Sequence, residues 1–327
     1  MTDTPPSVTV IVPARPGQEN IPAVDAASRL DYPADKLEIM VARGRQPACQ
    51  RNAALQEARG EFIYFLDDDA LPQPGNLQRA LSHFDRAEVQ MVGGPNVCPG
   101  EAPWLERVFA VVLGSWLAFG PSRARYEPVG GVRDTSEKEL ILCNLIARRE
   151  GLLAVGGFDE ALYPNEENAL MDNLQKKGGR LVYDPEVRVD RRPRPTLMAF
   201  GNMLMNYGRG RAEQFRRTPT LGSLPNFVPP AFVMYVVAAL VVTVLAPALG
   251  RYAGAPLGLY LLTVLVQTLV SSGRHGIVRS MAALPLVVMT HVLYGLGFWR
   301  GLLTRLPKEG HRSSVTLETL KSMRGAE

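Results

Sequence analysis

The sequence of 327 residues is long enough for one soluble domain with a full core and a further region behind it. A net charge of +4, without any RNA- or DNA-binding motif, argues against a nucleic-acid-binding protein. Three scattered cysteines, Cys49, Cys98 and Cys143, argue against a disulfide framework or a zinc site, and we expect them to be small core residues.

The first half of the sequence alternates short apolar runs with helical patterns. Such alternation predicts an α/β sheet with nucleotide-binding loops at one edge. The expected elements, in chain order, are strand 8–12, helix 21–30, strand 37–42, helix 50–59 ended by Gly60, strand 62–66 and strand 90–93.

Asp67, Asp68 and Asp69 directly follow the apolar strand 62–66. A strand that is apolar at every position is typical of the centre of a parallel sheet, and ligands bind at the carboxyl ends of such strands. Carboxylate oxygens suit Mg²⁺ or Mn²⁺, which take one or two protein carboxylates and add water and substrate phosphate. The sequence therefore indicates a divalent cation held against a diphosphate, and a solvated acidic turn is the alternative.

Three uncharged stretches in the second half are each long enough to cross a bilayer. Residues 226–250 and 252–273 contain no Asp, Glu, Lys or Arg, and residues 280–299 contain only His291 as a group that titrates near neutral pH. We predict three transmembrane helices, with a buried helical core as the alternative. Residues 8–12 are too short for the apolar part of a signal peptide, so we expect the soluble half to stay in the cytosol.

The basic residues crowd between Arg188 and Arg217, just before the first uncharged stretch. This placement suggests contact with anionic lipid headgroups or a lipid-linked phosphate. Residues 198–214 fit an amphipathic helix that brings Arg209 and Arg211 to headgroup depth, and a solvated basic face is the alternative. The predicted division is a soluble α/β domain over 1–195, a juxtamembrane segment over 196–225, a transmembrane region over 226–305 and a tail over 306–327.

Two features leave alternatives open. Residues 104–119, with several aromatic side chains, fit either a buried helix or an anchor at a bilayer surface. Three spans would place the tail on the side opposite the soluble domain, whereas the positive-inside rule favours the same side. A re-entrant or interfacial segment would remove that conflict. The cations that follow the last stretch are Arg300, Arg305, Lys308 and Arg312.

Five short motifs occur in order along residues 7–217. They are Val10-Ile11-Val12-Pro13-Ala14, Gln50-Arg51-Asn52, the run from Gly60 to Asp69, Gly156-Gly157-Phe158-Asp159-Glu160, and Glu166-Glu167. Together they resemble family 2 glycosyltransferases of the GT-A fold. Within that family the chain is most similar to membrane-bound bacterial enzymes of exopolysaccharide or cell-surface glycan assembly. The resemblance implies transfer of a sugar from a nucleotide donor, with inversion at the anomeric carbon.

The resemblance also implies a donor side and a metal site. The expected donor-binding residues are Pro13, Ala14, Arg51, Asp67 and Asp68. Asp67 and Asp69 would hold the metal, with Asp190 as a further ligand near the position where relatives often have a histidine. The arginines that follow Asp190 would alternatively grip the diphosphate. For Arg51, a guanidinium suits a phosphate oxygen, and a surface helix arginine is the alternative.

An inverting displacement needs a carboxylate that deprotonates the acceptor hydroxyl. Where relatives have Glu-Asp after the Gly-Gly-Phe-Asp-Glu motif, this chain has Glu166 and Glu167. We expect Glu167 to be the base and Glu166 to be the second choice, with a plain acidic helix N-terminus as the alternative. The residues expected on the acceptor or phosphate side are Asn144, Arg148, Asp159, Arg209 and Arg211.

Together these observations predict a GT-A domain on the cytosolic face of a bacterial inner membrane, followed by a bundle of transmembrane helices. The partners would be a nucleotide-sugar donor, a lipid-linked polyprenyl acceptor, Mg²⁺ or Mn²⁺ and membrane lipids, and no nucleic acid. Two alternatives remain: a transferase that uses the polyprenyl phosphate itself as acceptor, and an inactive scaffold subunit that binds a sugar nucleotide. The second strand runs into Arg43 where relatives place an Asp, so recognition of the nucleotide base is left open.

Overall fold

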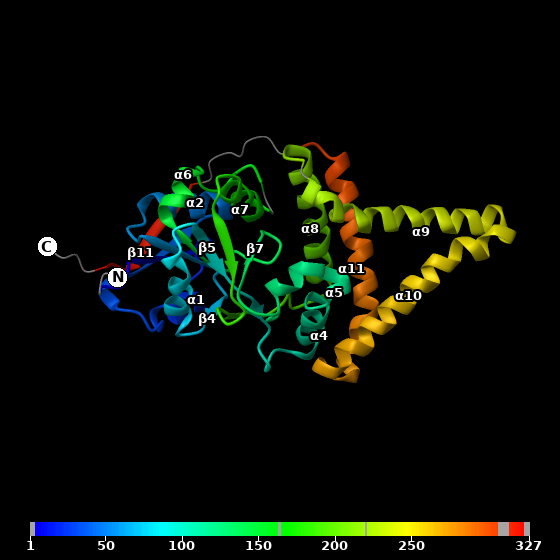
Figure 1. The fold of residues 1–327 in the computed structure, drawn as a ribbon, viewed down its shortest axis with the longest axis horizontal. Helices are drawn as coiled ribbons and strands as arrows, with labels where there is room; N and C mark the ends of the chain where they lie inside the picture. The colour runs from blue at the N-terminus through cyan, green and yellow to red at the C-terminus, as the bar shows by residue number, and fades with distance from the viewer. Residues whose placement is uncertain (1–3, 163–164, 220, 307–313, 324–327) are drawn as a thin grey trace. The chain divides into compact units, whose positions relative to one another are not determined.

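The structure is a computed structural model that describes residues 4–162, 165–219, 221–306 and 314–323. The chain forms two compact units (Figure 1). The sheet unit comprises Met1–Pro99, Pro121–Arg192 and Pro307–Glu327. The helical unit comprises Gly100–Gly120 and Pro193–Leu306.

Within the described residues, an eight-stranded mixed sheet forms the centre of the sheet unit, in the order β11-β2-β1-β3-β8-β5-β9-β7. Its strands are β1 (Val8–Ala14), β2 (Leu37–Arg43), β3 (Phe62–Leu66), β5 (Val89–Gly93), β7 (Arg133–Thr135), β8 (Asn144–Arg148), β9 (Arg180–Tyr183) and β11 (Thr316–Lys321). The predicted strands 8–12, 37–42, 62–66 and 90–93 are confirmed as β1, β2, β3 and β5.

The surroundings of β3 are only half as expected. β3 pairs in parallel with β1, but on its other side it pairs antiparallel with β8, in the register Leu66↔Asn144. The expectation of a parallel sheet was therefore wrong on that side. An apolar run reports burial of both faces of a strand, and it does not report the direction of the neighbouring strand.

Helices and a small second sheet complete the sheet unit. The helices are α1 (Pro22–Ser28), α2 (Pro47–Glu57), α3 (Asn76–Leu81), α6 (Arg149–Ala154) and α7 (Glu166–Lys176), and the 3-10 turns are η1 (Ala34–Lys36), η2 (Ser82–Asp85) and, at the boundary, η3 (Gly120–Arg125). The small sheet contains β4 (Leu71–Pro72), β10 (Val189–Asp190) and β6 (Asn96–Val97), with β10 in the middle. The helices predicted over 21–30 and 50–59 correspond to α1 and α2.

Strand β3 lies between two hydrophobic cores. Phe62, Tyr64 and Leu66 belong to one core, and Ile63 and Phe65 belong to the other, because successive side chains of a strand point to opposite faces. All five side chains are buried. The end of β3, where the acidic triplet begins, is therefore fixed by packing on both faces.

The segment predicted as a tail returns to the sheet. Strand β11 pairs antiparallel with β2, in the register Leu317↔Ala42 and Glu318↔Val41. Arg43 and Glu318 form an ion pair across the two strands, with Nε and Oε2 3.0 Å apart. An edge strand of the sheet is thus supplied by residues that follow every helix of the helical unit.

The helical unit contains short helices and three long ones. Its elements are α4 (Trp104–Leu113), α5 (Trp116–Phe119), α8 (Leu197–Arg217), η4 (Leu221–Phe227), α9 (Val228–Leu245), α10 (Pro247–His275) and α11 (Ile277–Leu303). In the described part of the chain, three segments are long and apolar enough to cross a membrane: Gly222–Leu245, Pro247–His275 and Ile277–Leu303. The helix predicted over 198–214 corresponds to α8.

Glycines bring α8 and α11 into close contact. A Cβ atom on Gly208 of α8 would lie 2.8 Å from the backbone nitrogen of Phe298. A Cβ atom on Gly301 of α11 would lie 2.8 Å from the Cβ of Ala212, and one on Gly297 would meet the backbone of Met205. We call Gly208, Gly297 and Gly301 the glycine seam, since larger side chains there would separate the helices.

Residues 104–119, for which a buried helix and a bilayer anchor were the two expectations, contain helices α4 and α5. Phe109 is buried and stacks on Phe200 of α8, with ring centroids 4.3 Å apart and planes 2° from parallel. Trp104 and Trp116, by contrast, are 48% and 61% exposed. The segment therefore has a buried aromatic face and an exposed one.

Candidate active site

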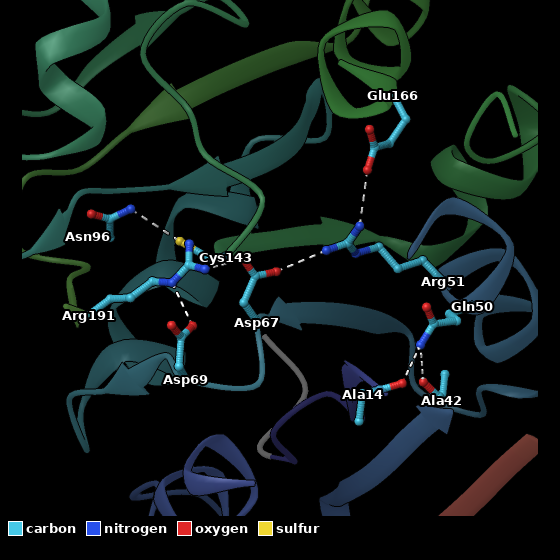
Figure 2. A network of polar contacts seen from close by, with 10 residues as sticks. All are labelled: Ala14, Ala42, Gln50, Arg51, Asp67, Asp69, Asn96, Cys143, Glu166 and Arg191. Atoms are coloured by element: carbon cyan, nitrogen blue, oxygen red, sulfur yellow. Dashed lines mark hydrogen bonds and ion pairs between the residues drawn. The ribbon is translucent and has the colours of Figure 1, made fainter. Parts of the chain in front are cut away.

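The acidic triplet starts where β3 ends, and Asp67 lies between two arginines (Figure 2). Arg51 of α2 donates from Nη2 to Oδ1 of Asp67 at 2.9 Å. Arg191, directly after β10, places Nη2 3.0 Å from Oδ2 of the same carboxylate. Both carboxylate oxygens of Asp67 are thus paired with positive charge.

Arg191 also reaches the third residue of the triplet. Its Nε donates to Oδ1 of Asp69 at 2.6 Å, so one guanidinium bridges Asp67 and Asp69 (Figure 2). The antiparallel pairing Asp190↔Leu71 between β10 and β4 brings Arg191 to the triplet. Burial opposes the charge of Arg191, but the carboxylates of Asp67 and Asp69 outweigh it, and the pKa of this guanidinium is raised well above its usual value.

Arg51 continues the series of charges to helix α7. Its Nη1 lies 3.3 Å from Oε1 of Glu166, the first residue of that helix. Glu166, Arg51, Asp67, Arg191 and Asp69 therefore alternate in sign, and we call them the charge chain (Figure 2). Alternation of this kind lets each buried charge meet an opposite one, which limits the cost of desolvation.

The two glutamates of α7 lie in different environments. Glu166 is only 3% exposed, and burial, together with the neighbouring charge of Glu167, raises its pKa to about 7 although Arg51 works in the opposite direction. Its Oε2 has no hydrogen-bond partner among the described residues. Glu167 is half-buried. Asn165, with a left-handed φ of 104°, ends the preceding loop and turns the chain into α7.

Two neighbours of Arg51 fix the loops around the charge chain. Gln50 donates from Nε2 to the carbonyls of Ala14, at 2.8 Å, and Ala42, at 2.5 Å, which ties together the ends of β1 and β2 (Figure 2). Asn52 donates to the carbonyl of Phe158 at 2.9 Å and accepts from its backbone N–H at 2.8 Å. Gln50 and Asn52 were not among the predicted site residues, although both belong to the Gln50-Arg51-Asn52 motif.

Gly157 shows how closely this loop approaches α2. Its φ of +74° lies in the left-handed region, and a Cβ there would meet Oδ1 of Asn52 at 2.6 Å. Only glycine fits both constraints. Helix α2 therefore fixes the position of the Gly-Gly-Phe-Asp-Glu motif through Asn52 and pairs with Asp67 through Arg51.

The other acidic residues expected at the site are engaged elsewhere. Asp68 accepts from Nε2 of Gln18 at 2.7 Å. Asp190 accepts from Nε2 of Gln73 at 3.0 Å, and exposed Asp159 accepts from the backbone N–H of Ala161 at 2.9 Å. The part of the chain that the structure describes contains no group of three or more His, Cys, Asp or Glu side chains placed to hold a metal ion.

The pair Asp67 and Asp69 nevertheless suits a magnesium-type ion. Such ions bind proteins through one or two carboxylates and fill the remaining positions with water and phosphate, so a third protein ligand is not required. The two carboxylates already share one cation, the guanidinium of Arg191. Their oxygens are thus close enough to a common point to hold a positive charge between them.

The residues expected on the acceptor side lie on different elements. Asn144 is fully buried on β8, where it accepts from Tyr64 and donates to the carbonyl of Val187. Arg148 pairs with Phe62 at the opposite end of β3 from Asp67 and donates to the carbonyls of Val89 and Phe84. Arg209 and Arg211 belong to α8 of the helical unit.

Three comparisons with known proteins bear on this site. Residues 30–129 match the family described as Glycosyl transferase family 2. The pre-mycofactocin glycosyltransferase of Mycobacterium tuberculosis (strain CDC 1551 / Oshkosh) is 30% identical over 150 residues, which cover 42% of this chain and 28% of that protein. The succinoglycan biosynthesis protein ExoA of Rhizobium meliloti (strain 1021) is 29% identical over 199 residues, which cover 61% and 57%.

A solved structure extends the similarity in fold. The mannosyltransferase PcManGT from Pyrobaculum calidifontis, determined in complex with GDP-Man and Mn²⁺, superposes with a TM-score of 0.54 at 19% identity. The match covers 92% of this chain and 90% of that one. At this identity the likeness concerns the fold. The mixed sheet and the family match over residues 30–129 agree with it, and the chain therefore carries a glycosyltransferase family 2 domain on a GT-A fold.

Proposed function

We propose that the protein transfers a sugar from a nucleotide donor to a lipid-linked saccharide, with inversion at the anomeric carbon. The observation that carries this proposal is the charge chain at the carboxyl end of β3, where two carboxylates and two guanidiniums meet. Such a site can neutralise a diphosphate with both a metal ion and arginines. The similar mannosyltransferase structure, which holds GDP-Man and Mn²⁺, supports a donor and a cation of this class.

Asp67 and Asp69 are the residues that would hold Mg²⁺ or Mn²⁺. A bound cation would stabilise the negative charge on the departing nucleoside diphosphate. Because Arg191 bridges the same two carboxylates, guanidinium and metal compete for them. Arg51 stays paired with Asp67 and Glu166 and orients both. Pro13, Ala14 and Asp68, at the ends of β1 and β3, belong to the donor side in this proposal.

Glu167 is the base that we prefer. A general base must be reachable by the acceptor and free to accept its proton. Glu166 is nearly inaccessible and is tied to Arg51, whereas the adjacent Glu167 is half-buried and so accessible from solvent. Glu166 would then orient Arg51, and Glu167 would take the proton from the acceptor hydroxyl.

The proposed acceptor follows from the long apolar helices of the helical unit. Helices long and apolar enough to cross a membrane support a lipid-linked acceptor at the cytosolic face of an inner membrane. The printed name of the similar ExoA protein, which refers to succinoglycan biosynthesis, supports a surface glycan. A polyprenyl phosphate would serve as acceptor without a strong base, so independence from Glu167 would indicate that alternative.

Donor binding with and without metal tests the proposal. We expect GDP-mannose or one of a panel of UDP-sugars to raise the melting temperature of the purified protein in the presence of Mn²⁺, because a ligand that binds the folded state stabilises it. Asp69→Ala should abolish the metal-dependent part of this shift. Asp85→Ala, an exposed residue of η2, should retain it and controls for loss of one negative charge.

Two outcomes would contradict the proposal. One is the same metal-dependent shift in Asp69→Ala and in the unmodified protein. The other is the lack of any shift with every donor tested. Donor binding without hydrolysis or transfer of the sugar would indicate the scaffold alternative.

A further inference from the structure

Strand β11 fixes the side of the membrane on which residues 316–321 lie. It forms a ladder with β2 from Thr316↔Arg43 to Lys321↔Ile39, with one irregularity, and the Arg43–Glu318 ion pair adds to it. Val315 and Leu317 pack against the buried core that includes Met40 and Ala42. Residues 316–321 are therefore on the same side of any membrane as the sheet itself.

This placement restricts the number of crossings. The rest of the sheet precedes α9, and β11 follows α11, so the chain leaves the sheet and later returns to it. A chain that starts and ends on one side of a bilayer crosses it an even number of times. The described residues contain three candidate spans. They cannot all cross.

Helix α11 is packed along much of its length on elements that precede the first candidate span. Its second half follows α8 across the glycine seam. Nη1 of Arg216, near the end of α8, donates to the carbonyl of Gly301 at 3.0 Å. Because α8 comes before α9, it lies on the side of the sheet, and α11 lies beside it.

The charges of α8 exclude this helix pair from the hydrocarbon. A charged residue at the bilayer centre costs about 2.5–3.5 kcal/mol on insertion scales. Arg209 and buried Glu213 pair across one turn, with Nε and Oε1 3.6 Å apart. The charged residues of α8 in its last three turns are Arg209, Arg211, Glu213, Arg216 and Arg217. The part of α11 that adjoins them belongs at the membrane surface.

Helix α11 also contacts α4 and α5. His291 donates from Nε2 to the carbonyl of Leu117 in α5 at 3.0 Å and accepts at Nδ1 from Tyr260 of α10. Residues 100–120 leave the sheet unit and return to it, and the ten residues of α4 span roughly 15 Å, about half of a bilayer core. The neighbours of α11 in α4 and α5 are thus also on the side of the sheet.

Helices α9 and α10 differ from α11. In the most apolar 18-residue stretch of each of the first two candidate spans, 11% of the residues are buried, compared with 33% in the stretch of α11. Large apolar side chains on both helices are exposed, among them Leu240, Val244 and Leu245 on α9 and Leu259 and Leu262 on α10. At 1.5 Å per residue, the 29 residues of α10 span roughly 43 Å, and the 24 residues of α9 with the preceding turn, Gly222–Leu245, span roughly 36 Å. Both exceed a bilayer core of about 30 Å.

We propose that only α9 and α10 cross the bilayer, as a helical hairpin, and that α4, α5, α8 and α11 lie on the membrane surface on the side of the sheet. This inference rests on the membrane attachment included in the proposed function. The partner of the surface helices is an anionic lipid surface. The exposed rings of Trp104 and Trp116 suit the interfacial region, where tryptophan is enriched.

The distribution of cations supports the hairpin. With two crossings, the cations before α9, Arg274 and Arg279 beside the junction of α10 and α11, and Arg300 and Arg305 at the end of α11 all lie on the side of the sheet. The connection between α9 and α10 has only Arg251 near it. Three crossings would instead place Arg300 and Arg305 on the opposite side, against the positive-inside rule. The conflict between the number of spans and the positive-inside rule thus disappears when α11 does not cross.

Cysteine labelling of the full chain in intact bacterial cells tests the hairpin. In a Cys98→Ser background, with Cys49 and Cys143 buried, single cysteines are introduced at three exposed positions: Ala248 after α9, Ser322 after β11 and Asp85 on the sheet unit. A membrane-impermeant maleimide is applied before and after permeabilisation, and each signal is divided by labelling after denaturation. We expect Ala248→Cys to label in intact cells, and Ser322→Cys and Asp85→Cys to label only after permeabilisation.

Two results would overturn the inference. Labelling of Ser322→Cys in intact cells would show an odd number of crossings and a β11 separated from β2. Protection of all three positions in intact cells would show that the hairpin does not cross. A sugar-transfer assay on the same variants keeps the two proposals apart, because the labelling pattern does not depend on whether transfer is detected.

Discussion

The charge chain of the sheet unit and the glycine seam of the helical unit hold their elements together in opposite ways. In the charge chain, Arg51 of α2 and Arg191, directly after β10, both pair with Asp67, and Arg51 also pairs with Glu166 of α7. In the seam, the absence of side chains lets the backbones of α8 and α11 touch. The first arrangement can rearrange its partners when a charged ligand arrives, and the second cannot.

Because of this difference, mutations in the charge chain and in the glycine seam should have different effects. A change in the charge chain should alter ligand binding, protonation or turnover while the fold persists. A change in the seam should alter the fold and leave the chemistry of the folded fraction intact. Substitutions at or next to the charge chain and in the seam should reveal that contrast.

The largest effect is expected for Glu167→Gln. If Glu167 takes the proton from the acceptor hydroxyl, this change should lower turnover by about 10²–10⁴-fold and leave donor affinity nearly constant. Glu166→Gln is the matched control and should be milder, since Glu166 is buried against Arg51. The measurements are turnover and donor binding for both variants with one lipid-linked acceptor.

Three results would change this assignment. Near-normal turnover in Glu167→Gln would remove Glu167 as the base. A severe loss in Glu166→Gln alone would transfer the role to Glu166. Small losses in both would favour a lipid phosphate acceptor, which needs no strong base.

The seam should be sensitive to added volume. In Gly297→Val the new side chain would meet the backbone of Met205, and overpacking of this kind costs about 1–3 kcal/mol. We expect a lower melting temperature of the detergent-solubilised protein. Gly258→Val in α10 is the control, because a Cβ there meets nothing within 4 Å. Equal melting temperatures for the two variants would contradict the close contact of α8 and α11.

The buried carboxyl of Glu166 should make stability depend on pH. Its pKa rises from 4.5 to about 7 on folding, so between these values the folded state keeps a proton that the unfolded state has lost. The unfolding free energy should therefore fall as the pH rises through this window, by on the order of 2 kcal/mol, and level off above it. Glu166→Gln should lack this decline, as measured by denaturant unfolding from pH 4.5 to 8. Parallel pH profiles for both proteins would contradict the prediction.

The smallest effect concerns the competition between Arg191 and metal. Removing a guanidinium that bridges Asp67 and Asp69 should tighten Mn²⁺ binding to the protein without donor by roughly tenfold, or about 1.4 kcal/mol. Calorimetry of Arg191→Ala measures this. Arg149→Ala, at the far end of β3, removes the same charge away from the site and should change little. Weaker Mn²⁺ binding in Arg191→Ala would mean that the arginine organises the carboxylates instead of competing for them.

The features predicted correctly from the sequence are those that depend on neighbouring residues along the chain. The apolar run 62–66 matches β3 residue for residue, and the uncharged stretches correspond to the three long helices. Both features can be recognised from consecutive residues, because a buried strand and a bilayer-length helix are each continuous apolar segments. Strand β11 was not predicted. Its residues are mostly exposed, and its partner β2 lies more than 270 residues earlier in the chain.

In the candidate site, too, residues in local motifs were predicted and a contact that depends on distant strand pairing was not. The triplet Asp67–Asp69 and its neighbour Arg51 stood out because they belong to local motifs. Arg191 was named only as an alternative to Asp190, since the pairing of β10 with β4 decides which of the two side chains faces the triplet. Such register between short strands depends on tertiary packing, which no local pattern reports.

Strand β11 also bears on how the protein is made. Until residues 316–321 leave the ribosome, β2 is the outer strand of the nascent sheet, and every one of its residues except Arg43 is buried in the finished fold. An uncovered apolar edge of this kind readily pairs with other chains. Because the three long apolar helices are synthesised before β11, the sheet can close only after all of them have left the ribosome. In the proposed hairpin arrangement, the sheet unit would therefore be completed after α9 and α10 have had the opportunity to insert.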